Sequence, residues 1–174
     1  ELYDALVEKE YWIQFFIFMR PDQITLESVK LLERLKTVGL HRVYVGIESG
    51  NSRYLIIYNK CITIEQIHEA IKRLNVIANN NDGLRLMPEY GFINFNPYST
   101  KRTLKENLRF LEKNSVIINP NILTSTTYIY PGTVLDEMIR RDGLYDSRNK
   151  DDDVKFTFCD LEVASIHKQL MMLS

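Results

Sequence analysis

The sequence predicts an α/β fold built around a parallel sheet. Strand-like and helix-like segments alternate along the 174 residues, and the run Val43–Ile47 is rich in β-branched and aromatic residues. A strand needs such a composition when both faces of its sheet are covered by helices. Four strand–helix units follow a first helix. They are enough for an incomplete barrel or for half of a doubly wound sheet.

The expected strands are short runs of β-branched and aromatic residues, and the expected helices have apolar residues at helical spacing. The strands are expected at 12–19, 42–47, 90–95 and 122–130, with a brief extended piece at 154–158. The helices are expected at 2–8, 25–38, 52–57, 63–77, 100–114, 134–141 and 161–173. Pro88 argues against a regular strand before Tyr90, because proline removes a backbone donor.

Local signals mark the ends of several helices. Thr25 stands three residues before Ser28, and Thr63 stands three residues before Gln66. The second pair has the capping-box pattern, in which side chains and backbone amides at a helix start satisfy each other. Gly39 follows the first of these helices at a position where a left-handed residue is favoured.

The composition excludes several classes of protein. The net charge is −1, with 45% hydrophobic and 26% charged residues, so there is no signal for a nucleic-acid or membrane partner. No apolar run approaches the ~20 residues that span a bilayer, and no signal peptide is seen. Cys61 and Cys159 form neither a disulfide framework nor a metal-ligand spacing. We therefore expect a reduced, cytoplasmic setting.

The sequence also suggests a piece of a longer protein. It begins at Glu1 within a helix-like segment and closes in another at 170–174. We expect residues 1–145 to form a partial barrel and residues 146–174 to form a C-terminal extension. A partial barrel exposes strand edges, so self-association through the strand at 12–19 is expected.

The clearest candidate site lies where the expected strands end. The segments 20–22, 48–51, 94–97 and 130–133 each combine polar side chains with Gly or Pro. In a parallel sheet these ends share one edge, which is where α/β folds bind ligands. Two other interpretations remain open: loops after strands are polar in any case, and Glu48 could simply cap the following helix.

No other pattern in the sequence predicts a catalytic or metal site. The three histidines belong to no Ser-His-Asp or His-Glu-x-x-His arrangement, and there is no glycine-rich phosphate loop. Asp151–Asp153 form a single acidic run without ligand spacing, which is more typical of a solvated loop than of a calcium site.

Four segments resemble radical S-adenosylmethionine enzymes, most closely the subgroup often joined to a cobalamin-binding domain. Residues 38–51, continued by 55–63, resemble the fourth-strand region of that family. Residues 92–111 resemble its fifth strand and helix. The segments 130–133 and 20–25 resemble its sixth-strand turn and the end of its third strand. The resemblance covers roughly residues 10–145.

The resemblance implies a partial, TIM-like barrel of six β/α units. It also implies a four-iron four-sulfur (4Fe-4S) cluster that reduces S-adenosylmethionine to a 5′-deoxyadenosyl radical. Glu48 matches the residue that meets the ribose hydroxyls, and Lys60 matches the one that pairs with the methionine carboxylate. Asn94 and Asn96 fall on the stretch that lines adenosine and substrate. The weaker candidates for the same cavity are Arg20 and Ser49. The alternative for Lys60 is a solvated surface lysine.

The sequence departs from the family in several places. The family holds its cluster with three cysteines spaced C-x-x-x-C-x-x-C, which Cys61 and Cys159 cannot supply. The glycine-rich second strand is missing as well, and both features are expected upstream of Glu1. Cobalamin stays open as a further cofactor, since its domain would also lie upstream. Phe18 stands where some relatives have a ribose-binding glutamate, and Asn94 stands where glycine is frequent.

The sequence therefore leaves two alternative functions open. The first is the S-adenosylmethionine-binding portion of a radical iron–sulfur enzyme. The second is a degenerate barrel domain that acts as a non-catalytic binding or scaffold module.

Overall fold

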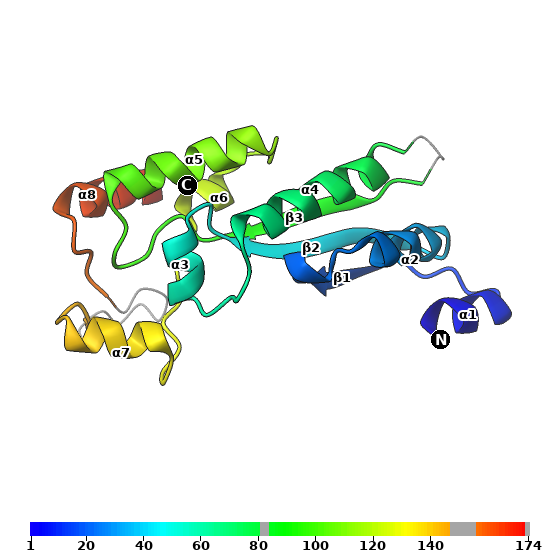
Figure 1. The fold of residues 1–174 in the computed structure, drawn as a ribbon, viewed down its shortest axis with the longest axis horizontal. Coiled ribbons are helices and arrows are strands. Elements are labelled where there is room, and N and C mark those ends of the chain that lie inside the picture. The colour runs from blue at the N-terminus through cyan, green and yellow to red at the C-terminus, as the bar shows by residue number, and fades with distance from the viewer. Residues whose placement is uncertain (81–83, 147–155, 173–174) are drawn as a thin grey trace. The chain divides into compact units, whose positions relative to one another are not determined.

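The computed structural model describes residues 1–80, 84–146 and 156–172. It divides into two compact units; Figure 1 shows the course of the chain through both. The first unit contains Glu1–Ile47 and Ile62–Gly91, and the second contains Glu48–Cys61 and Phe92–Ser174. Among the described residues, no helix has both the length and the apolar character that a membrane span requires.

A three-stranded parallel sheet forms the centre of the first unit. Its strands are β1 (Phe15–Met19), β2 (Leu40–Glu48) and β3 (Met87–Phe92), in the order β1-β2-β3. β1 and β2 pair in parallel, with Phe16 opposite Arg42 and Met19 opposite Val45. The expected α/β class with a parallel sheet is confirmed.

The helices of the first unit are α1 (Leu2–Glu8), the short 3₁₀ helix η1 (Pro21–Gln23), α2 (Leu26–Thr37) and α4 (Ile64–Ala78). The predicted helix starts are confirmed: Thr25 Oγ1 accepts from the Ser28 amide at 3.2 Å, and Thr63 Oγ1 accepts from the Gln66 amide at 3.2 Å. Such caps satisfy backbone donors that the first helical turn leaves unpaired.

Gly39 ends α2 as predicted, with a φ of +112°. A Cβ at this position would lie 2.1 Å from the carbonyl oxygen of Ile13. Backbone conformation and lack of space therefore both require glycine here. The turn that Gly39 makes leads directly into β2.

The core of the first unit lies between the sheet and its helices. Val43, Val45 and Ile47 of β2 are fully buried on one face of the strand, whereas Tyr44 on the other face is half-buried. α4 contributes Ile67 and Leu74, which are fully buried as well. Their helical spacing explains why one side of α4 is apolar.

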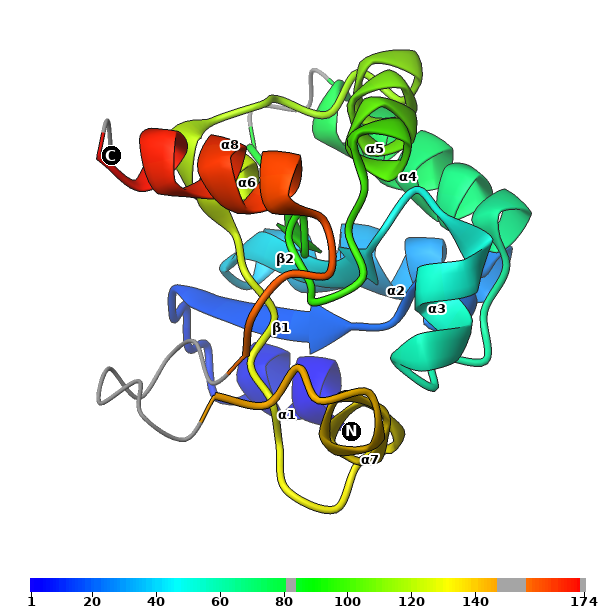
Figure 2. The same ribbon diagram turned by 90° about the vertical axis from the view of Figure 1, so that its left-hand side faces the viewer.

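The second unit consists mainly of helices. They are α3 (Ser52–Ile57), α5 (Lys101–Lys113), α6 (Pro120–Thr124), α7 (Val134–Arg141) and α8 (Leu161–Met171). Figure 2 shows α6 beside α8. One apolar cluster gathers residues from α3, α7 and the chain near Ile129, and another packs Phe95 and Leu104 against Val163 of α8. α8 belongs to the expected C-terminal extension, whose boundary at residue 146 stays a prediction.

The expected strand at 122–130 is wrong. Helix α6 occupies its first part, followed by a single parallel bridge between Phe95 and Thr126. The reason is a local cap: Asn119 Oδ1 accepts from the Ile122 amide at 3.0 Å, and Pro120 occupies the first helical turn, where its missing N–H costs nothing. This helix start overrides the β-branched composition that follows it.

Other boundaries differ by a few residues. β1 begins at Phe15 rather than Trp12, and β3 runs over Met87–Phe92 rather than 90–95. Pro88 therefore lies within β3, which is an edge strand and tolerates proline. Of the expected extended piece at 154–158, Phe156 forms an isolated bridge with Tyr145. Asp151–Asp153 lie outside the described residues.

Candidate functional site

Glu48 and Lys60 form an ion pair in the second unit. Lys60 Nζ lies 2.6 Å from Glu48 Oε1, and the two side chains are 31% and 16% exposed. Glu48 is the last residue of β2 and has a φ of +60°, which is unusual for a residue other than glycine. Its carbonyl accepts from the Ile93 amide at 2.7 Å. The strand end is therefore held in a strained conformation that turns Glu48 out of the strand direction.

The loop after α3 brings Lys60 back to Glu48. The amide of Lys60 donates to the carbonyl of Leu55 at 2.9 Å, which closes the last turn of the helix. Asn59 and Cys61, on either side of Lys60, both have left-handed backbone conformations, with φ of +52° and +51°. Two such residues within three positions give a tight and specific loop.

The alternative role of Glu48 as a helix cap is not what the structure has. Asn51 caps α3, because its Oδ1 accepts from the Arg53 amide at 3.0 Å. Asn51 also donates from Nδ2 to Glu106 at 2.6 Å. The carboxylate of Glu48 is thus available to Lys60 and to a ligand.

Ser49 is fully buried and has its hydrogen bonds within the protein. Its Oγ donates to Asn107 Oδ1 at 3.1 Å and accepts from the Asn51 amide at 3.1 Å. The Gly50 amide donates to the same Asn107 oxygen at 3.0 Å. A Cβ on Gly50 would lie 2.4 Å from Phe110 Cβ. This turn therefore attaches the segment after Glu48 to α5.

Asn94 is buried and keeps one acceptor unused within the described part of the chain. Its Nδ2 donates to the carbonyl of Leu123 at 2.9 Å, and its backbone amide donates to Ser125 Oγ at 2.9 Å. Its Oδ1 is buried without a hydrogen-bond partner among the described residues. Such a carbonyl is uncommon in folded proteins. It offers an acceptor to a hydrogen-bond donor of a ligand.

Asn96 is fully buried and its amide is held on both sides. Oδ1 accepts from the Tyr98 amide at 2.8 Å, and Nδ2 donates to the phenol oxygen of Tyr58 at 2.9 Å. Tyr58 was not among the residues singled out from the sequence, where it looks like an apolar residue at the end of a short helix. Burial raises the pKa of Tyr58, and the nearby charge of Glu48 adds to the shift. Tyr58 therefore stays protonated at neutral pH.

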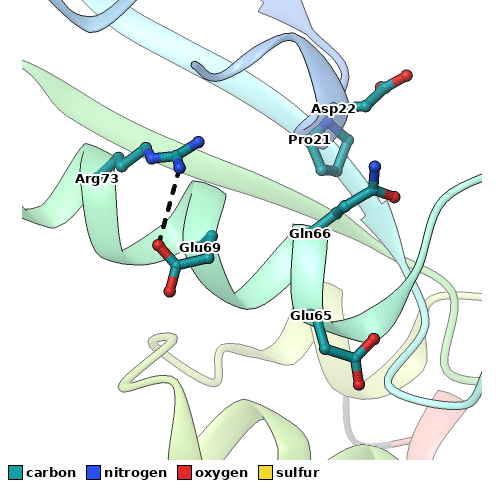
Figure 3. A pocket seen from close by; sticks show the side chains of 6 residues that line it. All are labelled: Pro21, Asp22, Glu65, Gln66, Glu69 and Arg73. Atoms are coloured by element: carbon teal, nitrogen blue, oxygen red, sulfur yellow. Dashed lines mark ion pairs between the residues drawn. The ribbon is translucent and has the colours of Figure 1, made fainter. Parts of the chain in front are cut away.

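Arg20 belongs to the first unit, whereas the other five predicted site residues belong to the second. Its Nε lies 3.0 Å from Asp22 Oδ1. The first unit also has a surface pocket of about 280 Å³ between η1 and α4, shown in Figure 3. Its lining residues are Pro21, Asp22, Glu65, Gln66, Glu69 and Arg73. Arg73 donates to the carbonyl of Ile24 at 2.6 Å and lies 3.9 Å from Glu69, so its charge is already shared.

The described residues include no group of three or more His, Cys, Asp or Glu side chains that could hold a metal ion. The sequence contains two cysteines, and both thiols are exposed and unlinked. A four-iron four-sulfur cluster held by three cysteines therefore does not fit the donor set of this chain.

Comparison with known proteins gives a consistent picture. No protein-family model matches the sequence. The chain is 28% identical over 138 residues to 4′-phospho-dehydrooxetanocin synthase of Priestia megaterium, covering 74% of this chain and 18% of that protein. The chain therefore spans about a fifth of this relative.

Solved structures give the fold similarity. The chain superimposes on the cobalamin-dependent S-adenosylmethionine radical enzyme OxsB with aqua-cobalamin and S-adenosylmethionine bound, with a TM-score of 0.75 and 21% identity. A second OxsB structure, with aqua-cobalamin bound, gives a TM-score of 0.77 and 20% identity. Each covers 99% of this chain and 30% of OxsB. The chain thus has the fold of part of a cobalamin-dependent radical enzyme and a distant sequence similarity to it.

Proposed function

We propose that this chain is the S-adenosylmethionine-binding part of a radical enzyme, and that Glu48 and Lys60 hold opposite ends of that molecule. The observation that carries the proposal is the partly buried ion pair at the end of β2, where Lys60 Nζ lies 2.6 Å from Glu48 Oε1. The fold similarity to OxsB, which has been solved with S-adenosylmethionine bound, supports it.

The two side chains have the chemistry that the ligand needs. An ionised carboxylate only accepts hydrogen bonds, which suits the two adjacent hydroxyls of a ribose. An ammonium offers three donors and a positive charge, which suits the carboxylate of the methionine moiety. Without a ligand the two groups pair with each other. On binding, the ribose hydroxyls donate hydrogen bonds to the carboxylate of Glu48, and the ligand carboxylate replaces Glu48 as the partner of Lys60.

Asn94 fits the same ligand. Its buried Oδ1 has no partner among the described residues, and leaving an acceptor unsatisfied costs about 1–3 kcal/mol. A donor of the ligand, such as an amino group on its adenine, would recover that cost. Ser49 and Asn96 act differently, because their polar atoms already bond to the protein. They hold the segments that follow β2 and β3 in place.

The iron–sulfur cluster would supply the electron that cleaves S-adenosylmethionine. The two cysteines of this chain do not form its three-cysteine ligand set, so its ligands would come from outside these 174 residues. The part of the chemistry assigned to this chain is to bind and orient S-adenosylmethionine. We assign no cobalamin contact to its residues.

The experiment is calorimetric titration of S-adenosylmethionine into the intact parent protein with a reconstituted cluster, as the wild type and as the variants Glu48→Ala and Lys60→Ala. Each variant should weaken binding by about 1–3 kcal/mol, which is roughly 5- to 150-fold in Kd. Lys101→Ala is the matched control, because Lys101 pairs with Glu162 at 3.1 Å in an exposed position. Unchanged affinity in both site variants would refute the assignment.

The second candidate function is a scaffold module, which the missing cysteine set favours. A scaffold would give no heat with millimolar S-adenosylmethionine in any of these proteins. The sequence of the parent protein before Glu1 provides an independent test. Three cysteines in the family spacing there favour the enzyme, and their absence favours the scaffold.

A further inference from the structure

We infer that Tyr58 is a positioning residue of this site, because its hydroxyl ties Asn96 to the loop that carries Lys60. The inference rests on the proposed function, which it extends to a residue that the sequence alone does not single out. The hydrogen bond from Asn96 Nδ2 to the Tyr58 oxygen spans 2.9 Å and joins residues 38 positions apart.

Both the backbone and the ring of Tyr58 contact the helix that precedes it, α3. Its amide donates to the carbonyl of Tyr54 at 2.8 Å, and the two rings lie 6.4 Å apart. The side chain packs against the apolar cluster that contains Tyr54 and Ile57. Lys60 follows only two residues later, after the left-handed residue Asn59. A fixed Tyr58 therefore restricts the backbone from which the Lys60 side chain extends.

The Asn96 amide can face Tyr58 in only one orientation. Its Oδ1 accepts from the Tyr98 amide at 2.8 Å, so Nδ2 must point to the phenol. The backbone amide of Asn96 donates to Ser99 Oγ at 2.9 Å, which fixes the chain at the same residue. The phenol oxygen is thus the acceptor of this bond. Without it, Nδ2 would be left buried without an acceptor at this position.

This arrangement links two segments that the proposed site needs together. Glu48 and Lys60 form one of them, and the chain at Asn94–Asn96 forms the other. Small displacements of positioning groups lower affinity and reactivity even when no contact with the ligand is lost. Removing the phenol oxygen should therefore weaken ligand binding, although the ligand is held by other residues.

The test compares Tyr58→Phe with Tyr54→Phe. Both remove one phenol oxygen: Tyr54 lies within α3, and Tyr58 is the residue that follows it. The Tyr54 hydroxyl lies 2.9 Å from both the Tyr98 carbonyl oxygen and Thr103 Oγ1. We expect Tyr58→Phe to weaken S-adenosylmethionine binding about 3- to 10-fold. Tyr54→Phe should lower the unfolding temperature but leave Kd unchanged. Equal losses of affinity in both variants would show a general structural effect and overturn the inference.

A double variant tests the route through Asn96. If Tyr58 acts by holding Asn96, Tyr58→Phe combined with Asn96→Ala should bind no more weakly than Asn96→Ala alone. Additive losses would contradict that route. A ligand-free measurement is the side-chain amide signal of Asn96 in nuclear magnetic resonance spectra. It should move in Tyr58→Phe and stay in place in Tyr54→Phe; an unmoved signal in Tyr58→Phe would refute the contact.

The same titrations separate the two proposals. If Glu48→Ala and Lys60→Ala leave affinity unchanged, the assignment of the site is wrong and the role of Tyr58 in it falls too. If those two variants weaken binding and Tyr58→Phe does not, the site stands and only the role of Tyr58 is wrong.

Discussion

Gly50→Ala should disturb the turn that follows Glu48. The backbone of Gly50 does not need a left-handed conformation, so the effect is purely one of space. An added Cβ would lie 2.4 Å from Phe110 Cβ and 2.5 Å from Phe110 Cγ. Nonbonded carbons at optimal contact lie about 3.5–4.0 Å apart, so the turn or α5 must move by about 1 Å. The bonds from Ser49 and Gly50 to Asn107 hold that same turn to α5 and resist the movement.

Overpacking of this kind costs about 1–3 kcal/mol. For a chain of this length each kcal/mol lowers Tm by about 2–4 °C, so Gly50→Ala should unfold roughly 2–12 °C below the wild-type protein in a calorimetric or circular-dichroism melt. Phe110→Ala should not rescue it, because the atom nearest to the new Cβ is Phe110 Cβ itself, which alanine retains. A Gly50→Ala protein with wild-type Tm, or a full rescue by Phe110→Ala, would refute the steric argument.

Two further predictions concern stability against pH and self-association. Burial lowers the pKa of His167, whose Nε2 lies 2.9 Å from Thr126 Oγ1. The folded protein therefore binds this proton less readily than the unfolded chain. The free energy that neutral His167 contributes to folding should be fully present above pH ~6.5. It should be lost as the pH drops through the lower pKa of the folded state. Urea titrations should show a flatter pH dependence in His167→Gln. β1 is an edge strand without charges, and Phe18 is 70% exposed. We predict self-association through this edge, which Phe18→Lys should reduce in light scattering. Ile117→Lys, at an apolar position that is 82% exposed, should not. A monomeric wild-type chain would contradict this prediction.

The elements that could be predicted from the sequence are those specified by nearby residues. The caps at Thr25 and Thr63 depend on side chains three positions away, and Gly39 depends on one backbone turn. α6 was missed although its signal, Asn119 followed by Pro120, was present. The β-branched residues after it outweighed a two-residue start signal in the sequence interpretation.

The candidate site was predictable only in part, because its contacts are tertiary. Glu48 and Lys60 were singled out by a resemblance, but nothing in the sequence indicates that Asn59 and Cys61 adopt left-handed conformations that bring Lys60 to Glu48. Tyr58 could not be found at all, since its partner Asn96 lies in a distant segment. The unused Oδ1 of Asn94 likewise appears only once its neighbours are placed.

The Glu48–Lys60 pair has a consequence for which molecules the proposed site accepts. The pair is neutral as a whole, so it attracts neither anions nor cations from a distance. A molecule that engages only one partner must break this partly buried ion pair without replacing both of its charged contacts, which is costly. Adenosine alone or methionine alone would meet this penalty. A molecule that carries both the ribose hydroxyls and the carboxylate replaces the one ion pair with two new polar contacts. The proposed site should therefore favour the whole ligand over either of its halves.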